Sequence, residues 1–203
     1  MAASLARVWE NVLDWEHLPW LHGDTFAAIR LERADRAGWR ARVDVRGSVD
    51  PLLIDVAVDR AAGRYHTRTV DGPGTGTDIV TTLTPAPAGT RVDVAFLVPG
   101  MTADAAPAVG AFYRTLYAKL WDEDEAMMVR RQAVLDDTLP GQCRDVAVEG
   151  RSYRFVAVCP HLGGPLDAAP IDDGCITCPW HGYRFDVRTG RSADGRGLAL
   201  HSA

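Results

Sequence analysis

Two short segments of this 203-residue sequence place cysteine next to histidine. They read Cys159-Pro-His161 and Cys178-Pro-Trp-His181, with residues 162–177 between them. Two thiolates can hold one iron of a [2Fe-2S] cluster while two imidazoles hold the other. The same four side chains would also satisfy a zinc ion. Zinc requires neither the prolines after both cysteines nor the glycines at positions 163, 164 and 182, whose turns let backbone N–H groups approach cluster sulfurs. The pattern therefore favours an iron–sulfur cluster.

Over Arg144–Leu200 the sequence resembles the Rieske family, whose [2Fe-2S] cluster has these ligands. The resemblance implies that Cys159, His161, Cys178 and His181 bind the cluster. In members of respiratory complexes a disulfide joins the two loops, and the matching positions here are Gly164 and Trp180. The sequence is thus similar to the low-potential ferredoxin or oxygenase branch.

A second set of candidate ligands lies near the N-terminus, in the pattern Asp14-x2-His17-x4-His22. The histidines are five residues apart, which does not match one face of a regular helix. A distortion around Pro19 would allow both to reach one metal, and neutral imidazole is a good ligand for ferrous iron. Taken alone, two histidines near a helix end are more often surface or cap residues.

The long helix predicted from Ala105 to Leu135 supplies a carboxylate. At about 100° per residue, one apolar stripe contains Asp124, which is costly to bury unless it is protonated, paired or bound to a metal. The stripe consists of Tyr117, Leu120, Trp121, Met127, Met128 and Leu135. The neighbouring acids Asp122, Glu123 and Glu125 are expected to face solvent. Arg131 is an alternative partner for Asp124, but two histidines with one carboxylate form the facial triad of non-haem iron oxygenases.

The stretches Asn11–His22 and Trp121–Gln132 are similar to motifs of Rieske non-haem iron oxygenases. The resemblance implies that His17, His22 and Asp124 bind a mononuclear Fe(II). Asp14 matches the acid that connects the cluster to this iron, although it could instead be a polar surface residue. The family normally places the Rieske domain first, whereas here the order is reversed.

The resemblance further implies an enzyme that hydroxylates or oxidatively demethylates an apolar or aromatic small molecule with dioxygen. An external reductase or ferredoxin would supply electrons, and the family expectation is a homotrimer. Trp121, Met127 and Met128 are candidate lining residues of the substrate cavity. Two alternatives stay open. The chain could be a non-catalytic electron-transfer protein, a Rieske ferredoxin fused to a ligand-binding domain, or it could be an accessory subunit of another oxygenase.

The elements that must position these residues follow from the pattern of apolar residues. A helix is predicted over Ser4–Leu21, ending or turning at Pro19. Six alternating segments then predict an antiparallel meander, over Phe26–Glu32, Trp39–Val45, Leu52–Val58, Arg64–Val70, Asp78–Thr84 and Arg91–Val98. With the long helix, this order resembles the helix-grip (START-like) fold. We therefore predict an α+β chain: a helix-grip catalytic domain over residues 1–138, then a small all-β Rieske domain over 139–203. A linker is expected over Asp136–Gly141.

Composition restricts the partners. The chain is 47% hydrophobic and 24% charged, with a net charge of −5 and both signs interspersed, so nucleic acid and anionic membranes are not expected as partners. The sequence shows neither a membrane-spanning run nor a secretion signal, which predicts a cytoplasmic protein. Cys143 and Cys175 are expected to be small buried residues. His66 and His201 are expected to take no part in a site.

Overall fold

The computed structural model describes residues 1–139 and 141–202. The chain divides into two compact units, Met1–Met128 and Val129–Ala203, and each is described by itself. The division falls inside the long helix α3 (Ala106–Leu135). The domain boundary expected after residue 138 stays a prediction, and Pro140 of the expected linker lies outside the described residues.

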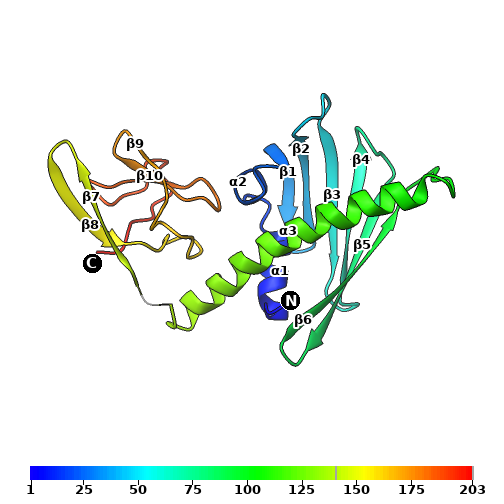
Figure 1. Cartoon of the computed structure of the whole chain (residues 1–203), viewed down its shortest axis with the longest axis horizontal. Helices are drawn as coiled ribbons and strands as arrows, with labels where there is room; N and C mark the ends of the chain where they lie inside the picture. The colour runs from blue at the N-terminus through cyan, green and yellow to red at the C-terminus, as the bar shows by residue number, and fades with distance from the viewer. Residues whose placement is uncertain (140, 203) are drawn as a thin grey trace. The chain divides into compact units, whose positions relative to one another are not determined.

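The first unit is built on a six-stranded antiparallel sheet in which each strand pairs with the next along the chain (Figure 1). The strands are β1 (Phe26–Asp35), β2 (Gly38–Val45), β3 (Leu52–Asp59), β4 (Arg64–Asp71), β5 (Asp78–Ala86) and β6 (Gly89–Leu97). Every predicted strand is present. Alternating burial along β2 and β5 shows that one face of the sheet is covered.

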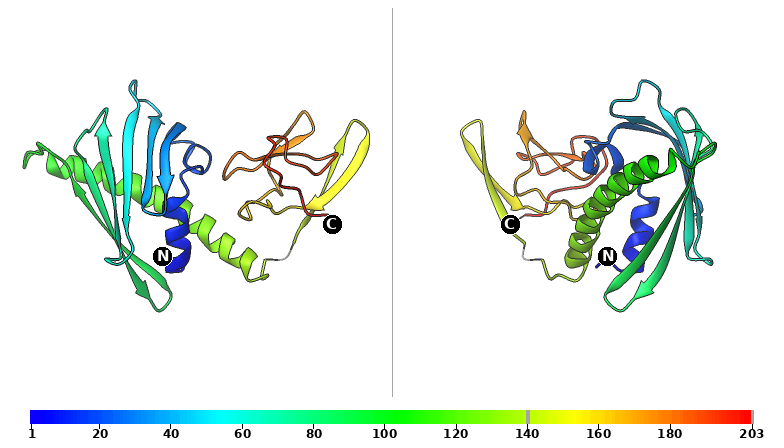
Figure 2. Two further views of the ribbon diagram at one scale, coloured as in Figure 1. Left: turned by 180° about the vertical axis from the view of Figure 1, so that it is seen from behind. Right: turned by 45° about the vertical axis from the view of Figure 1, so that its right-hand side comes forward.

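Helix α1 (Leu5–Leu13) and helix α3 lie on the same side of the curved sheet (Figure 2). Their contact with the sheet forms the core, in which Trp9 of α1, Trp39 of β2 and Met128 of α3 are buried. The indole Nε1 of Trp39 also donates a hydrogen bond of 2.9 Å to the carbonyl of Val12 at the end of α1. The α+β helix-grip architecture predicted from the sequence is therefore confirmed.

The helix predicted over Ser4–Leu21 is wrong in one respect, because it is two helices. Helix α1 ends at Leu13, and a four-residue helix α2 (Leu18–Leu21) follows. Pro19 lies in the first turn of α2 instead of ending a helix. Proline is favourable there because the first N–H groups of a helix have no partner within the helix and the fixed φ of proline suits it.

The second unit contains the last turns of α3 and two small sheets. A hairpin joins β7 (Cys143–Val148) to β8 (Arg151–Val156), and a three-stranded sheet has the order β11-β10-β9. The latter strands are β9 (Ile171–Asp172), β10 (Cys175–Thr177) and β11 (Arg184–Asp186). The prediction that the two remaining cysteines are buried is wrong, because Cys143 is exposed on β7 and Cys175 is half-buried. Short strands bury only alternate positions, and these two lie on the outward side.

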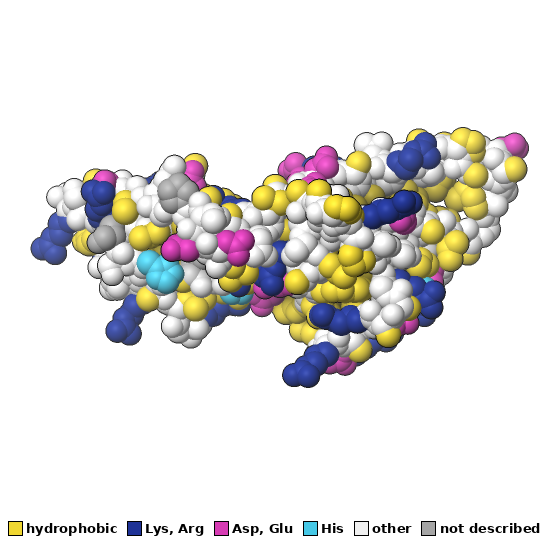
Figure 3. Space-filling model, turned by 90° about the horizontal axis from the view of Figure 1, so that it is seen from below, with side chains coloured by type: hydrophobic (Ala, Val, Ile, Leu, Met, Phe, Trp, Pro, Cys, Tyr) yellow, Lys and Arg dark blue, Asp and Glu magenta, His cyan; other side chains and the backbone are white. Residues whose placement is uncertain are grey.

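Lysine and arginine side chains are interspersed with aspartate and glutamate on the face seen in Figure 3, as the composition predicted. Within the described residues, no helix is both long enough and apolar enough to span a membrane.

Candidate metal centres

Two loops of the second unit carry the Cys/His motifs, and both contain the same turn. In the first loop the Cys159 carbonyl accepts a 2.9 Å hydrogen bond from the Gly163 amide, and the Cys159 amide donates to the Gly164 carbonyl at 2.8 Å. In the second loop Cys178 makes the equivalent bonds with the Gly182 amide and the Tyr183 carbonyl, at 2.9 and 2.8 Å. The repeated turn presents each cysteine sulfur in a similar way.

Glycine is required where the loops approach each other. A Cβ atom on Gly164 would lie 2.6 Å from the Sγ atom of Cys178, so any side chain there would collide with the sulfur. Gly163 has a φ of +82°, and a Cβ there would meet Val134 of α3 at 2.9 Å. Nε of Arg130, also on α3, donates a 2.9 Å hydrogen bond to the Gly163 carbonyl. The end of α3 therefore braces the first loop.

All four predicted cluster ligands come together. Cys159 and Cys178 are buried, and the rings of His161 and His181 lie 4.7 Å apart between centroids. A hydrogen bond between the two thiol groups raises the pKa of Cys159 and lowers that of Cys178. Two adjacent sulfurs, two adjacent imidazoles and a glycine backbone packed against one sulfur fit a [2Fe-2S] cluster with mixed ligands.

An aromatic stack adjoins these ligands. The ring of Tyr183 is stacked on that of His161, and the guanidinium carbon of Arg196 lies 4.0 Å from the centroid of the Tyr183 ring. Arg196 also donates a hydrogen bond to the Tyr183 hydroxyl. Tyr183 and Arg196 carry no signal in the local sequence, because only the fold brings the C-terminal segment next to the second loop.

In the first unit, His17, His22 and Asp124 converge, as predicted. Oδ1 of Asp124 lies 3.4 Å from Nε2 of His17 and 3.0 Å from Nε2 of His22. One potential ligand atom from each residue lies within 4.8 Å of the others, and all three residues are buried. Two imidazoles and a carboxylate in this arrangement fit a divalent transition metal that keeps open coordination positions.

The break between α1 and α2 produces this convergence. His17 is the N-cap residue of α2 and His22 is its C-cap residue. Because α2 is a single turn, residues at its two ends lie close together, and the two ring centroids are 5.1 Å apart. A five-residue spacing unsuited to one helix face therefore brings both imidazoles to one point.

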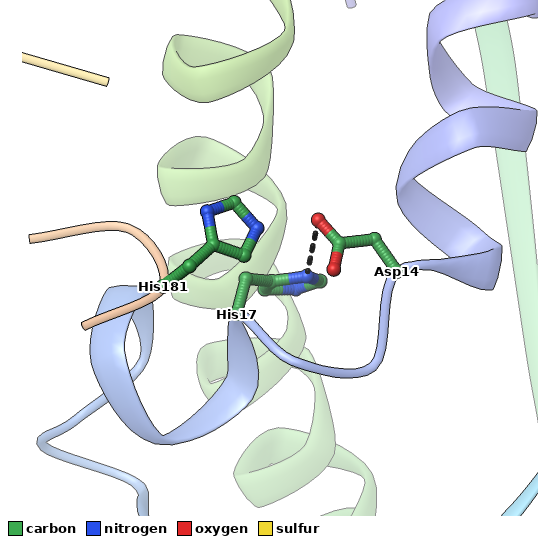
Figure 4. Close-up of side chains that lie close together, drawn as sticks. All are labelled: Asp14, His17 and His181. Carbon is green, nitrogen blue, oxygen red and sulfur yellow. Dashed lines mark ion pairs between the residues drawn. The ribbon is translucent and has the colours of Figure 1, made fainter. Parts of the chain in front are cut away.

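Further polar side chains orient the three residues. Nδ1 of His22 lies 2.6 Å from Oε2 of Glu123, and Nδ1 of His17 lies 3.6 Å from Oδ2 of Asp14 (Figure 4). The amide of Asn11 donates a 3.0 Å hydrogen bond to Asp124. Burial opposes protonation of His22, but the hydrogen bonds and negative charges of Asp124 and Glu123 outweigh it and raise its pKa. Carboxylates behind both histidines direct Nε2 toward Asp124, a common arrangement around bound metals.

Two of these supporting residues correct or extend the sequence analysis. Glu123 does not face solvent as predicted, because its carboxylate bonds to His22, whereas Asp122 is exposed. Asn11 was not identified, although a polar residue between the buried Val8 and Val12 of α1 is a usable signal.

A cavity of about 460 Å³ lies between the sheet and α3, with the three candidate ligands in its lining. Trp121 lines it as predicted, whereas Met128 belongs to the core. The stripe along α3 also ends earlier than predicted, since Leu135 is 48% exposed. His66 lies on the other side of β4 from the cavity-lining Tyr65, and its Nδ1 is 3.0 Å from Asp78.

Residues 119–199 match the family model of the Rieske [2Fe-2S] domain. The chain carries a Rieske [2Fe-2S] domain. The match supports the cluster over the zinc site that the four ligands alone left open. Along the chain the Rieske domain follows the curved antiparallel sheet.

Two curated relatives match short stretches of this chain. Apoptosis-inducing factor 3 of Homo sapiens is 46% identical over 44 residues, which cover 21% of this chain and 7% of that protein. Cholesterol 7-desaturase nvd of Hemicentrotus pulcherrimus is 38% identical over 47 residues, which cover 23% of this chain and 10% of that protein. The chain thus spans a tenth or less of the length of these relatives.

Among solved structures, a START superfamily protein from Mycobacterium smegmatis is similar, with 18% sequence identity and a TM-score of 0.45. The similarity covers 63% of this chain and 93% of that protein. The fold assignment of the first unit rests on its own strand order and helix placement.

Proposed function

We propose that this chain is a Rieske-type oxygenase with two metal centres. Cys159, His161, Cys178 and His181 would hold the [2Fe-2S] cluster, and His17, His22 and Asp124 would hold a mononuclear Fe(II). The observation that supports the second centre is the convergence of two Nε2 atoms on one buried carboxylate oxygen beside the cavity. When bound there, ferrous iron supplies open coordination positions for dioxygen and substrate.

The protein side chains would hold the ligands in a fixed geometry. Asn11 fixes the carboxylate of Asp124, Glu123 fixes the ring of His22, and Asp14 lies behind His17. Apolar cavity walls would exclude water from the reacting substrate. Asp14 is also the residue proposed to connect electron flow to this site.

The relatives indicate the class of reaction. One relative is named as a cholesterol 7-desaturase, an oxidative activity on an apolar molecule. We propose the same general chemistry here, with an external reductase or ferredoxin as electron donor and dioxygen as co-substrate. The proposal also includes a domain order that is permuted relative to the oxygenase arrangement, and a homotrimeric assembly.

Metal analysis of anaerobically purified protein tests the proposal. The oxygenase is expected to contain three irons per chain, two in the cluster and one at the facial triad. His17→Ala and Asp124→Ala should each lower the content to two irons while the visible absorption of the cluster is unchanged. Exposed Asp122→Asn on the same helix is the matched control and should retain three. Two irons in the unaltered protein would instead support the non-catalytic electron-transfer protein.

A further inference from the structure

The lining of the cavity in the first unit is apolar along one strand and carries hydroxyl groups along the next. On β3, the inward residues Leu52, Ile54 and Val56 form an apolar wall. Next to it, the inward residues of β4 are Tyr65, Thr67 and Thr69, so each carries a hydroxyl group. Register pairs Val56 with Thr67 and Ile54 with Thr69. The substrate space is therefore bounded by hydrocarbon on one strand and by a row of hydroxyl groups on its neighbour.

Helix α3 adds hydroxyl groups opposite the sheet. Tyr113 and Tyr117 line the cavity one turn apart. Burial raises the pKa of Tyr117 and of Tyr65, so both phenols are neutral hydrogen-bond donors at physiological pH. From Phe112 to Asp124 the lining follows α3 for about 18 Å at 1.5 Å per residue. The cavity is therefore elongated, with the candidate metal ligands near one end.

The charges of the lining restrict the ligand. Among the described residues that line the cavity there is no lysine or arginine, whereas Asp14 and Asp124 contribute carboxylates. Away from the candidate metal ligands, an anionic group would lose its hydration without gaining a counter-ion. A pure hydrocarbon would cover the hydroxyl groups of Thr67 and Thr69 without offering them a hydrogen-bonding atom, which also costs free energy.

We propose that the substrate is a neutral, elongated and largely apolar molecule, such as a fused-ring phenol or quinone, with oxygen atoms along one edge that bond to Tyr65, Thr67 and Thr69. This inference rests on the proposed function, because it places such a molecule next to the facial triad. A volume of about 460 Å³ is in the range of pockets for small organic ligands. The threonines act as specificity residues, since they contact the edge of the substrate away from the metal.

Calorimetric titration of the full-length holoprotein with three tricyclic probes tests the proposal. The probes are 1,8-dihydroxyanthraquinone, which has three oxygens on one edge, anthracene, which has none, and the 3-carboxylate derivative of the first probe. The dihydroxy probe is expected to bind at least about 10-fold more tightly than anthracene, the gain expected from one or two net hydrogen bonds. It should also bind more tightly than its carboxylate derivative, whose charge would lose hydration without gaining a counter-ion.

The double variant Thr67→Val with Thr69→Val removes the hydroxyl groups at nearly constant shape. It should weaken binding of the dihydroxy probe about 10-fold and leave the affinity for anthracene unchanged or higher, which also shows that the cavity is intact. Thr82→Val, exposed on the other face of β5, is the control and should change neither affinity.

The inference would be overturned if the three probes bound with equal affinity, if the carboxylate bound more tightly, or if no probe bound. It would also be overturned if the double variant lost the same affinity for the dihydroxy probe and for anthracene. The iron content of the same samples separates it from the proposed function. Three irons per chain without hydroxyl-dependent binding would refute the substrate class alone. Two irons with hydroxyl-dependent binding would refute the oxygenase while the cavity's selectivity stands.

Discussion

The ring of Tyr183 lies nearly parallel to the ring of His161, with 4.2 Å between centroids and 15° between planes. The guanidinium group of Arg196 also lies over the ring of Tyr183. A cation close to a cluster ligand favours the reduced cluster, because reduction adds negative charge. The stack therefore connects the C-terminal segment to the redox properties of the Rieske domain.

We expect Arg196→Gln to lower the midpoint potential of the cluster. The side chain of Arg196 is 43% exposed, so solvent screening limits the shift to the order of 20 mV. Redox titration followed by electron paramagnetic resonance measures it. Arg154→Gln removes the same charge from β8, where the side chain is 61% exposed and pairs with Asp145, and should leave the potential unchanged. An equal shift in both variants would show that only net charge matters.

Gly164→Ala should abolish most cluster binding. The new methyl group would lie 2.6 Å from the Cys178 sulfur, and a clash with a ligand atom cannot be relieved by rotating a flexible side chain. Iron and sulfide content together with visible absorption provide the measurement. Gly141→Ala meets only an ordinary contact of 3.5 Å with Val156 and should retain the cluster. Full cluster content in the Gly164 variant would contradict the close approach.

Glu123→Gln should weaken the mononuclear site without affecting the cluster. Loss of the charge behind Nδ1 makes His22 a poorer ligand, and such outer partners typically contribute 10-fold or more to metal affinity. Ferrous iron titration of the metal-depleted first site gives the affinity. Asp122→Asn, one position earlier and exposed, is the matched control. The interpretation fails if both variants bind iron as tightly as the unaltered protein.

Trp39→Phe should destabilise the first unit. The substitution removes the hydrogen bond to the Val12 carbonyl, two residues before Asp14, and leaves that buried oxygen without its donor. The free energy of unfolding should fall by about 1–3 kcal/mol. Urea denaturation of the protein, followed by tryptophan fluorescence, measures this change. Trp20 is 48% exposed, so Trp20→Phe should change stability by less than about 0.5 kcal/mol.

The strands of the first unit could be predicted because strands such as β2 and β5 bury one face, which leaves a two-residue alternation in the sequence. Asp124 could be identified for a similar reason, since a carboxylate on an apolar helical stripe conflicts with its surroundings. The Cys/His loops needed no three-dimensional information, because each cysteine and its histidine are close in sequence.

Other parts depend on contacts between distant residues. Glu123 resembles any exposed acid until α2 brings His22 beside it, a pairing across 101 positions. The break after Leu13 has no clear sequence signal, because Pro19 is expected to end or turn a helix, whereas it lies in the first turn of a new one. The stack on His161 depends on where the last residues return to the second loop, and local sequence carries no signal for that.

The two turns around Cys159 and Cys178 have a consequence for the stability of the newly made chain. They belong to a small unit with short strands, whose buried side chains include Phe155, Leu166 and Phe185. Four metal bonds across these turns would act as a cross-link in a domain of a size that often needs one. Supply of iron and sulfide to the newly made chain would then decide whether this unit persists or is degraded.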